Sequence, residues 1–526
     1  MARGASDPRQ TQAASADSAS VEGRSPGKRP PGFWPAARFN SIKARRDVHQ
    51  ATIGPALPKA KVSKSAAKSP KASIGIALIR AAEWPGVSKR LGPQARAAAA
   101  LARFTAKPGE LALVGDARGA PSRVLFGIGE KSDAMALRSL AGRLAPGAYH
   151  LEAVPFGFSA DGIALAWALG THRFDRYKAA RGERPASLET PRGADADEAE
   201  HLAHACALAR DMINTPANDM GPRQVETIAR EIAEFYGATV TVVVGDDLIE
   251  AGYPAVHAVG RAAVSARAPR MIELSWGQGK RGKPKRPHVV LVGKGVVFDS
   301  GGLDIKPSAG MRQMKKDMGG AAHALALGRM IMAAKLPVRL TVLTPVVENA
   351  ISGDAMRPGD VLATRKGLSV EVGNTDAEGR LILADALARA GELSPDLTID
   401  LATLTGAARV ALGPDVAPFY TSDDALAADL AAASLKVSDP IWRMPLWSGY
   451  EGAIDSDVAD VANDAEPWAQ AGSITAALFL RRFAPAGSWA HFDIFAWNPR
   501  NRPGWPKGAE VQAIRAIYAM LKARYA

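Results

Sequence analysis

The sequence predicts an α/β protein whose larger, C-terminal domain contains a mixed, largely parallel sheet covered by helices on both faces. From residue 72 onward, short and continuously apolar segments alternate with helical segments, a pattern typical of strands buried on both faces. The 526 residues also exceed what one hydrophobic core supports. We therefore expect a smaller α/β domain before the larger one, preceded by a disordered basic tail.

The tail is predicted over residues 1–71, which are rich in Ser, Ala, Pro, Lys and Arg and lack sustained apolar periodicity. Residues 1–70 hold 13 Lys and Arg against 4 Asp and Glu, so +9 of the formal net charge of +13 lies there. Such a tail can bind phosphate nonspecifically. Its composition also loosely resembles an organelle transit peptide, but it contains no clean amphipathic helix.

The smaller domain is predicted over residues 72–185, where strands alternate with helices. The expected strands are SIGIALI, ELALVG and SRVLFGIG, and the expected helices are QARAAAALARF and DAMALRSLAGRL. Residues 186–220 follow as a linker and connecting helix, because the polar segment TPRGADADEAE precedes the helical pattern HLAHACALARDMI.

The larger domain is predicted over residues 221–526. It opens with the helix PRQVETIAREIAEFYG, which has Pro near its start and Gly at its end. Further helices are expected at AHALALGRMIMAA and LILADALARA, and strands at TVTVVV, RMIELSW, HVVLVG, RLTVLTPVV, DLTIDLATL and AHFDIFA. Sites in such sheets form at the carboxyl ends of the strands.

The composition excludes several classes of protein. No stretch of about 18 uncharged apolar residues is present, so no membrane-spanning helix is expected. The single cysteine, Cys206, excludes a disulfide framework and a cysteine-cage metal site, and it fits a reducing compartment such as the cytoplasm. Any metal ion must therefore use oxygen and nitrogen ligands.

Polar residues gather after one predicted strand. The strand HVVLVG leads directly to Lys294, and a Gly-flanked, turn-rich segment then sets out Asp299, Lys306 and Asp317. The order of these residues places charged groups where a site in an open α/β sheet is expected.

A second group lies in the segment EVGNTDAEGRLILADAL, where Asp376, Glu378 and Arg380 alternate in a loop that enters a helix starting near Leu381. Alternate residues in extended backbone point to one side, so these groups are expected to converge. The four carboxylates of both groups would repel one another without cations. Two divalent ions roughly 3.5 to 4 Å apart would compensate them, and zinc or manganese suits oxygen ligands joined by one amine.

The segments GKGVVFDSGG, DIKP, KKDMGGAA and NTDAEGRL resemble the signature segments of the leucine aminopeptidase (cytosol aminopeptidase) family. The resemblance covers roughly residues 200–526. It implies a binuclear metallopeptidase with five metal ligands. Asp299 and Glu378 would bridge the ions, Lys294 and Asp317 would complete the tight site, and Asp376 would complete the more exchangeable one.

The resemblance also implies the catalytic pair Lys306 and Arg380. Lys306 would polarise the scissile carbonyl, and Arg380 would hold a bicarbonate ion that acts as general base. Substrates would be short peptides with a free N-terminus, and leucine and other apolar residues would be preferred. The expected assembly is a homohexamer. Substrate-binding roles fall on Met314, Thr403, Leu404 and Gly406, although Met314 fits core packing equally well.

Three other functions fit the sequence less well than a metallopeptidase. A DNA-binding or architectural role would favour a basic stripe on the folded surface, whereas most excess charge here lies in the tail. A binuclear phosphoesterase usually binds its metal ions through His and Asp. The predicted roles of Lys294 and Lys306 therefore argue against this class of enzyme. An inactive homologue is disfavoured by the intact ligand set. The segment around Lys294 lacks the full phosphate-loop pattern, and His491 in WAHFDIF is predicted to be structural.

Overall fold

The structure is a computed structural model that describes residues 73–130, 133–178, 186–278, 286–465, 468 and 470–526. The predicted basic tail, residues 1–71, lies outside the described residues. Among the helices that the structure does describe, none has the length and apolar character needed to cross a membrane.

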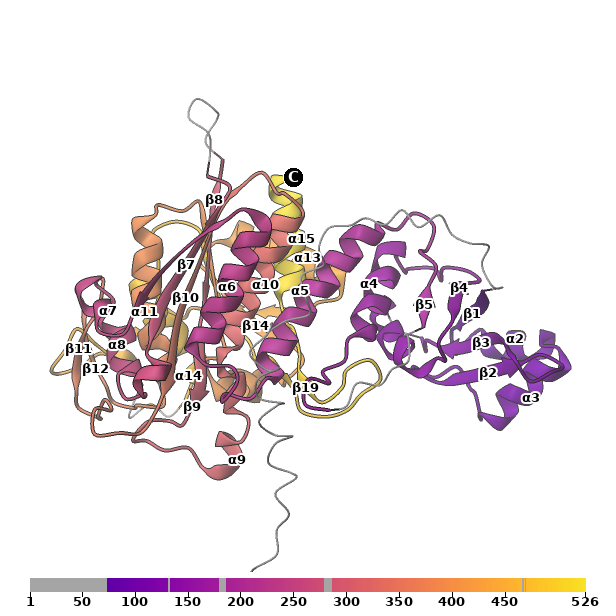
Figure 1. Ribbon diagram of the computed structural model, residues 1–526, viewed down its shortest axis with the longest axis horizontal. Helices are drawn as coiled ribbons and strands as arrows, with labels where there is room; N and C mark the ends of the chain where they lie inside the picture. Colours follow the sequence, from indigo (N-terminus) through magenta and orange to yellow (C-terminus); the bar gives the residue numbers. More distant parts are fainter. Residues whose placement is uncertain (1–72, 131–132, 179–185, 279–285, 466–467, 469) are drawn as a thin grey trace, which may run out of the picture. The chain divides into compact units, whose positions relative to one another are not determined.

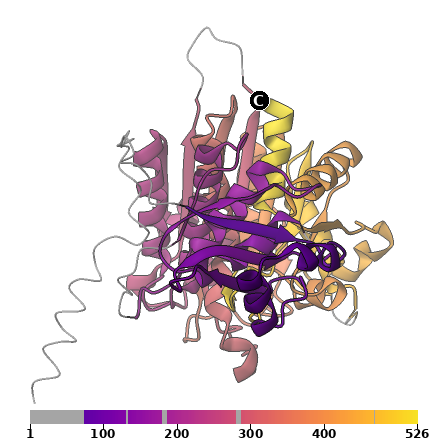
Figure 2. The ribbon, with the colours of Figure 1, turned by 90° about the vertical axis from the view of Figure 1, so that its right-hand side faces the viewer.

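A five-stranded sheet forms the smaller domain, in the order β2-β3-β1-β4-β5. Its strands, drawn in indigo and purple, face the viewer in Figure 2. The pairs β1/β3, β1/β4 and β4/β5 are parallel, and β2/β3 is antiparallel. The bounds are β1 Ile74–Ile79, β2 Leu111–Gly115, β3 Pro121–Gly127, β4 Ala148–Leu151 and β5 Ser187–Leu188.

Both faces of this small sheet are buried. On β3, Val124 and Phe126 belong to one apolar cluster and Leu125 to another, because successive side chains of a strand point to opposite faces. The strands β1, β2 and β4 supply further members of these clusters, and the surrounding helices supply others. Their bounds are α2 Trp84–Arg90, α3 Pro93–Leu101, η2 Ala134–Ser139, η3 Ala141–Arg143 and α4 Ala160–Thr171.

Two helical predictions need correction. The segment DAMALRSLAGRL forms the two short 3-10 helices η2 and η3, not one α-helix. Ala134, Leu137 and Leu140 are buried three residues apart, which matches the three residues per turn of a 3-10 helix. The connecting helix α5, Ala196–Asn214, begins inside the polar segment that the sequence indicated as linker, because the Asp195 side chain caps its first turn.

A nine-stranded mixed sheet forms the larger domain, in the order β15-β14-β17-β13-β8-β10-β7-β6, with β9 paired to β10. The central strands β17, β13, β8 and β10 run parallel, and antiparallel pairs flank them. The bounds are β6 Thr239–Val244, β7 Arg270–Trp276, β8 His288–Gly293, β9 Gly295–Asp299, β10 Arg339–Asn349, β13 Leu397–Ala402, β14 Ala417–Tyr420, β15 Ile441–Arg443 and β17 Trp489–Asp493.

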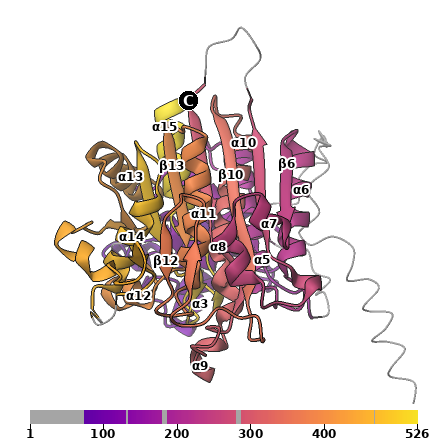
Figure 3. The same cartoon turned by 90° about the vertical axis from the view of Figure 1, so that its left-hand side faces the viewer.

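Helices cover both faces of this sheet, as the sequence predicted. On β8, Val289 and Leu291 pack in one cluster with α5, α6, α10, α13 and α15, while Val290 and Val292 pack in the other with α8, α11 and α14. Figures 1 and 3 show α10 and α11 on opposite sides of the strands. The bounds are α6 Pro222–Tyr236, α7 Asp247–Glu250, α8 Pro254–Gly260, α10 Gly319–Ala333, α11 Glu378–Glu392, α13 Asp424–Val437, α14 Gly472–Phe483 and α15 Ile514–Tyr525.

Short elements complete the rim of the larger domain. Such short strands and helices have too few residues to show a clear periodicity, so the sequence did not predict them. They are η4 Ser265–Arg267, α9 Ser308–Met311, η5 Met314–Met318, β11 Val361–Ala363, β12 Ser369–Glu371, α12 Gly406–Leu412, η6 Ser448–Ile454, β16 Val461–Ala462, β18 Trp497–Asn498 and β19 Gly508–Ala509. Of these, η5 and α12 carry side chains of the site described next.

Candidate active site and metal centre

Polar and charged side chains meet at the carboxyl ends of β8, β9 and β13, as expected for this sheet class. Lys294 follows β8, Asp299 ends β9, and Thr403 follows β13. The sequence indicated a turn-rich segment between Lys294 and Asp299. In the structure this segment forms the strand β9, which pairs with β10. The turn comes only after Asp299, where Gly301 and Gly302 adopt the left-handed backbone conformation that favours glycine.

Two lysines bridge the carboxylates of the site. Lys294 Nζ lies 2.9 Å from both Asp317 Oδ2 and Glu378 Oε1. Lys306 Nζ lies 2.7 Å from Asp299 Oδ2 and also pairs with Asp376. The structure therefore brings together four predicted carboxylate ligands and both predicted lysines.

The loop that carries Asp376 is fixed by hydrogen bonds and by one close packing contact. Asn463 Oδ1 accepts from the backbone N–H groups of Gly373 and Asn374, at 2.9 and 3.2 Å. A Cβ on Gly379 would lie 2.5 Å from both Cε and Nζ of Lys294. A larger residue at position 379 would therefore displace the end of the Lys294 side chain from its present position beside Glu378.

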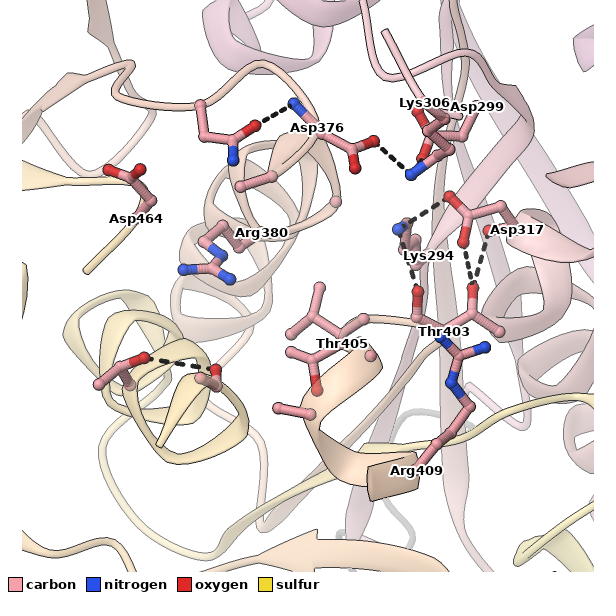
Figure 4. Close-up of a pocket in the computed structure, with 18 of the residues that line it drawn as sticks. Lys294, Asp299, Lys306, Asp317, Asp376, Arg380, Thr403, Thr405, Arg409 and Asp464 are labelled. Atoms are coloured by element: carbon pink, nitrogen blue, oxygen red, sulfur yellow. Dashed lines mark hydrogen bonds and ion pairs between the residues drawn. The ribbon is translucent and has the colours of Figure 1, made fainter. Parts of the chain in front are cut away.

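One predicted feature of this loop is wrong. The helix α11 begins at Glu378, so Glu378 and Arg380 lie in its first turn and not at alternate positions of an extended loop. A helix turns by about 100° per residue, so Glu378 and Arg380 point to different sides of α11. Figure 4 shows Arg380 on the side of the cavity that carries Asp464, apart from the lysine and carboxylate cluster.

The donor set fits a metal site. One oxygen each from Asp299, Asp376 and Glu378 lie within 4.8 Å of one another. Glu378 is fully buried; its Oε1 pairs with Lys294, a lysine that it shares with Asp317, and its Oε2 has no hydrogen-bond partner within the described part of the chain. Burying a carboxylate without hydrogen-bond donors is costly unless a cation compensates it. Oxygen ligands with one amine suit a divalent ion such as zinc or manganese.

The pKa values reflect this crowding. Burial and then the charge of Asp299 raise the pKa of Asp376 to about 6, and the same two causes raise the pKa of Glu378 well above its usual value. Burial alone lowers the pKa of Lys294, but Asp317, Glu378 and Asp299 together raise it above its usual range. A metal ion bound through Lys294 Nζ must displace that proton.

A cavity of about 730 Å³ opens above the cluster, a size typical of small-ligand sites. The four predicted substrate-binding residues, Met314, Thr403, Leu404 and Gly406, all line it. Thr403 also supports the cluster, since its carbonyl accepts from Lys294 Nζ at 3.2 Å and its hydroxyl donates to Asp317 Oδ1 at 2.8 Å. Figure 4 shows Thr403 between Lys294 and Asp317 on one side and α12 on the other.

Sequence reasoning missed several residues of the cavity wall. Lys316, Arg409, Asp464, Trp468 and Phe495 line it as well. The lysine doublet before Asp317 was a visible signal, because it places two cations directly beside a predicted ligand. Nothing in the local sequence around the other four indicated that they would reach this cavity.

Comparison with known proteins identifies the family. A model of the cytosol aminopeptidase family, catalytic domain, matches residues 207–518, and a model of the M17 aminopeptidase N-terminal domain matches residues 74–191. This chain belongs to the cytosol aminopeptidase family. It is therefore a leucyl aminopeptidase-type hydrolase of peptide bonds, and the resemblance seen in its sequence is confirmed.

Relatives and solved structures agree with this assignment. A probable cytosol aminopeptidase of Syntrophotalea carbinolica is 40% identical over 377 residues, which are 69% of this chain and 74% of the relative. The crystal structure of the cytosol aminopeptidase from Coxiella burnetii matches with a TM-score of 0.81 at 43% identity, covering 87% of this chain and 99% of that one. The bottromycin maturation enzyme BotP in complex with Mn matches with a TM-score of 0.75 at 34% identity, covering 86% and 99%.

Proposed function

We propose that this aminopeptidase releases N-terminal residues from short peptides with two divalent metal ions bound by Lys294, Asp299, Asp317, Asp376 and Glu378. One observation carries the proposal: Glu378 is fully buried beside Asp299 and Asp376, and one oxygen from each of the three carboxylates lies within 4.8 Å of the others. Such ions supply Lewis-acid activation of water and of the scissile carbonyl when bound. Zinc or manganese suits the donor set, and the BotP relative is in complex with Mn.

Lys306 is the proposed donor to the oxygen of the scissile carbonyl. Burial alone lowers its pKa, but Asp299 raises it above its usual value, so the side chain remains an ammonium ion. Its Nζ is held between Asp299 and Asp376 at the edge of the cavity. A fixed cation there stabilises the negative charge that develops on the substrate oxygen in the transition state.

Arg380 is the proposed site for bicarbonate, the general base. Its guanidinium is almost fully buried, at 8% exposure, and its Nε has no hydrogen-bond partner within the described residues. Burial lowers the pKa of Arg380 to about 10, so it stays charged near neutral pH. A planar anion with two acceptor oxygens suits such a group.

The cavity wall supports leucine as a first residue of the substrate. Met314 and Leu404 present apolar side chains beside Thr403 and Gly406. We extend the proposal to a homohexamer that acts in the cytoplasm, on the resemblance to the family and on the name of the relatives. Light scattering on the purified protein measures the assembly.

The experiment that tests the proposed function is hydrolysis of leucine p-nitroanilide by the purified protein. Activity should disappear after chelation and return with added manganese or zinc. Glu378→Ala and Lys306→Ala should both abolish the restored activity. Metal-independent hydrolysis, or no hydrolysis of any amino-acid amide, contradicts the proposed function.

A further inference from the structure

Two cations, Lys316 and Arg409, stand on the wall of the same cavity without a role in the mechanism above. Lys316 belongs to η5, and Arg409 belongs to α12. Lys316 Nζ lies 5.2 Å from the centre of the Phe495 ring, and Arg409 Cζ lies 4.5 Å from the centre of the same ring. Figure 4 shows the Arg409 side chain extending from α12 toward Thr403. The two charges are therefore held together on one aromatic residue.

Neither cation has an acidic partner among the residues that the structure describes. Lys316 is only 5% exposed, yet it makes no ion pair, and Arg409 makes none either. A buried cation such as Lys316 that shares an aromatic residue with a second cation is costly unless an anion joins them.

The nearest carboxylates of the chain are committed elsewhere. Asp493 accepts from the backbone N–H groups of Leu404 and Thr405 and from the Thr405 hydroxyl. Asp317 accepts from the Thr403 hydroxyl and lies 2.9 Å from Lys294 Nζ. The cation pair thus faces a cavity and not a protein anion, which is the arrangement expected of a site for an anionic group of a ligand.

We propose that Lys316 and Arg409 bind a carboxylate group of the peptide substrate. This inference rests on the proposed function, because it places the carboxylate in the cavity that holds the scissile bond. Lys316 is adjacent in sequence to Asp317, and Arg409 follows Thr403 by less than two helical turns. Two parts of a substrate carry a carboxylate within that reach: the side chain of an acidic first residue, or the C-terminus of a dipeptide. The aliphatic part of either substrate would pack on Phe495 and Met314.

Two matched pairs of substrates separate these sources. α-Glutamyl p-nitroanilide against glutaminyl p-nitroanilide tests a side-chain carboxylate, and Leu-Gly against Leu-glycinamide tests a C-terminal one. With metal-loaded wild type, kcat/KM should favour the carboxylate-bearing member of at least one pair. Hydrogen bonds to charged groups contribute about 1.5 to 3 kcal/mol, so that advantage is expected to be about 10- to 100-fold.

The variants K316M and R409L should each remove this advantage while leaving the uncharged member of the pair within a few-fold of wild type. The matched control is K315M, because Lys315 is the neighbouring lysine but donates to the backbone carbonyl of Asn214 and does not line the cavity. K315M should keep the advantage. The melting temperature of K316M should equal or exceed that of wild type, since the substitution removes a buried charge without a partner. A marked fall in melting temperature would assign Lys316 to the structure and overturn the proposal.

Binding without turnover keeps the test independent of the proposed function. Glutarate, but not its uncharged analogue glutaramide, should raise the melting temperature of wild type and of K315M, and should fail to do so for K316M and R409L. Cleavage of leucine p-nitroanilide with no carboxylate advantage in either pair overturns the inference and leaves the proposed function standing. Absence of cleavage together with variant-sensitive glutarate binding contradicts the proposed function and supports the carboxylate site.

Discussion

Two buried carboxylates of the larger domain, Asp400 in β13 and Glu378 at the start of α11, are stabilised in different ways. On the paired strands β13 and β17, Asp400 contacts His491 Nδ1 at 2.5 Å through one oxygen and accepts from Trp489 Nε1 at 2.8 Å through the other. Near the carboxyl ends of the strands, Glu378 at the start of α11 is as deeply buried, but its Oε1 shares Lys294 with Asp317 and its Oε2 has no hydrogen-bond partner among the described residues. A buried carboxylate with complete partners serves the fold, whereas one without them marks the place for an external cation.

The largest effect is expected from a substitution in the proposed metal site. Glu378→Gln removes a negative charge that the proposed metal ions require. Activity with leucine p-nitroanilide should fall by more than the roughly 10- to 100-fold that loss of a hydrogen bond behind a metal ligand costs. The pKa of Glu378 is raised by burial, so the melting temperature of the metal-free variant should equal or exceed that of wild type. A large loss of metal-free stability with full activity would contradict this role.

The matched experiment removes Asp400, the buried carboxylate whose two oxygens both have partners. Asp400→Ala leaves His491 buried beside Trp489 without its carboxylate, and removing one partner of a buried pair costs about 3 to 5 kcal/mol. Denaturant unfolding of the metal-free protein measures this loss. The result should be the reverse of Glu378→Gln, since stability falls while activity per folded molecule persists. Equal stability of wild type and Asp400→Ala would show that the pair contributes nothing to the fold.

A smaller effect on activity is expected from a substitution at Gly379, which contacts the proposed metal site only through packing against Lys294. Gly379→Ala places a Cβ where Lys294 now lies, 2.5 Å from its Cε, and the lysine has to move. Displacing a catalytic group by about 1 Å can cost about 100-fold in rate. The control is Gly86→Ala in α2, where a Cβ meets nothing within 4 Å. Kinetics on both variants should show a loss for the first and none for the second.

The smallest expected effect is a pH dependence that sharpens the comparison. Burial alone lowers the pKa of His491, but Asp400 raises it above 6.5 in the folded protein. Stabilisation by the charged pair is therefore complete below pH 6.5 and is lost as the pH rises through the raised pKa. Each pKa unit contributes about 1.4 kcal/mol. The stability difference between wild type and Asp400→Asn should be largest below pH 6.5 and shrink above it, and a difference that grows with pH would reverse the assignment.

Local pattern was sufficient for much of the fold and for most of the proposed ligands. Buried strands such as β8 and β13 are continuously apolar, and helices such as α6 carry Pro at the start and Gly at the end. The segments around Asp299 and Glu378 indicated the family because their residues and spacing are specific. These features depend on residues that are close together in the sequence, so they can be recognised without a structure.

Contacts between distant segments lie beyond local pattern. The first turn of α11 directs Glu378 and Arg380 to different sides, whereas the sequence suggested convergence. Lys316 and Arg409 are 93 positions apart in the chain and meet only because η5 and α12 border the same cavity at Phe495.

The order of residues thus specified which chemical groups this protein carries and the class of sheet that presents them. Folding alone determined which of those groups share a cavity and which lack partners. The physical reason is that burial and charge pairing depend on side chains brought together from separate strands and helices, as Glu378 on α11 and Asp400 on β13 demonstrate.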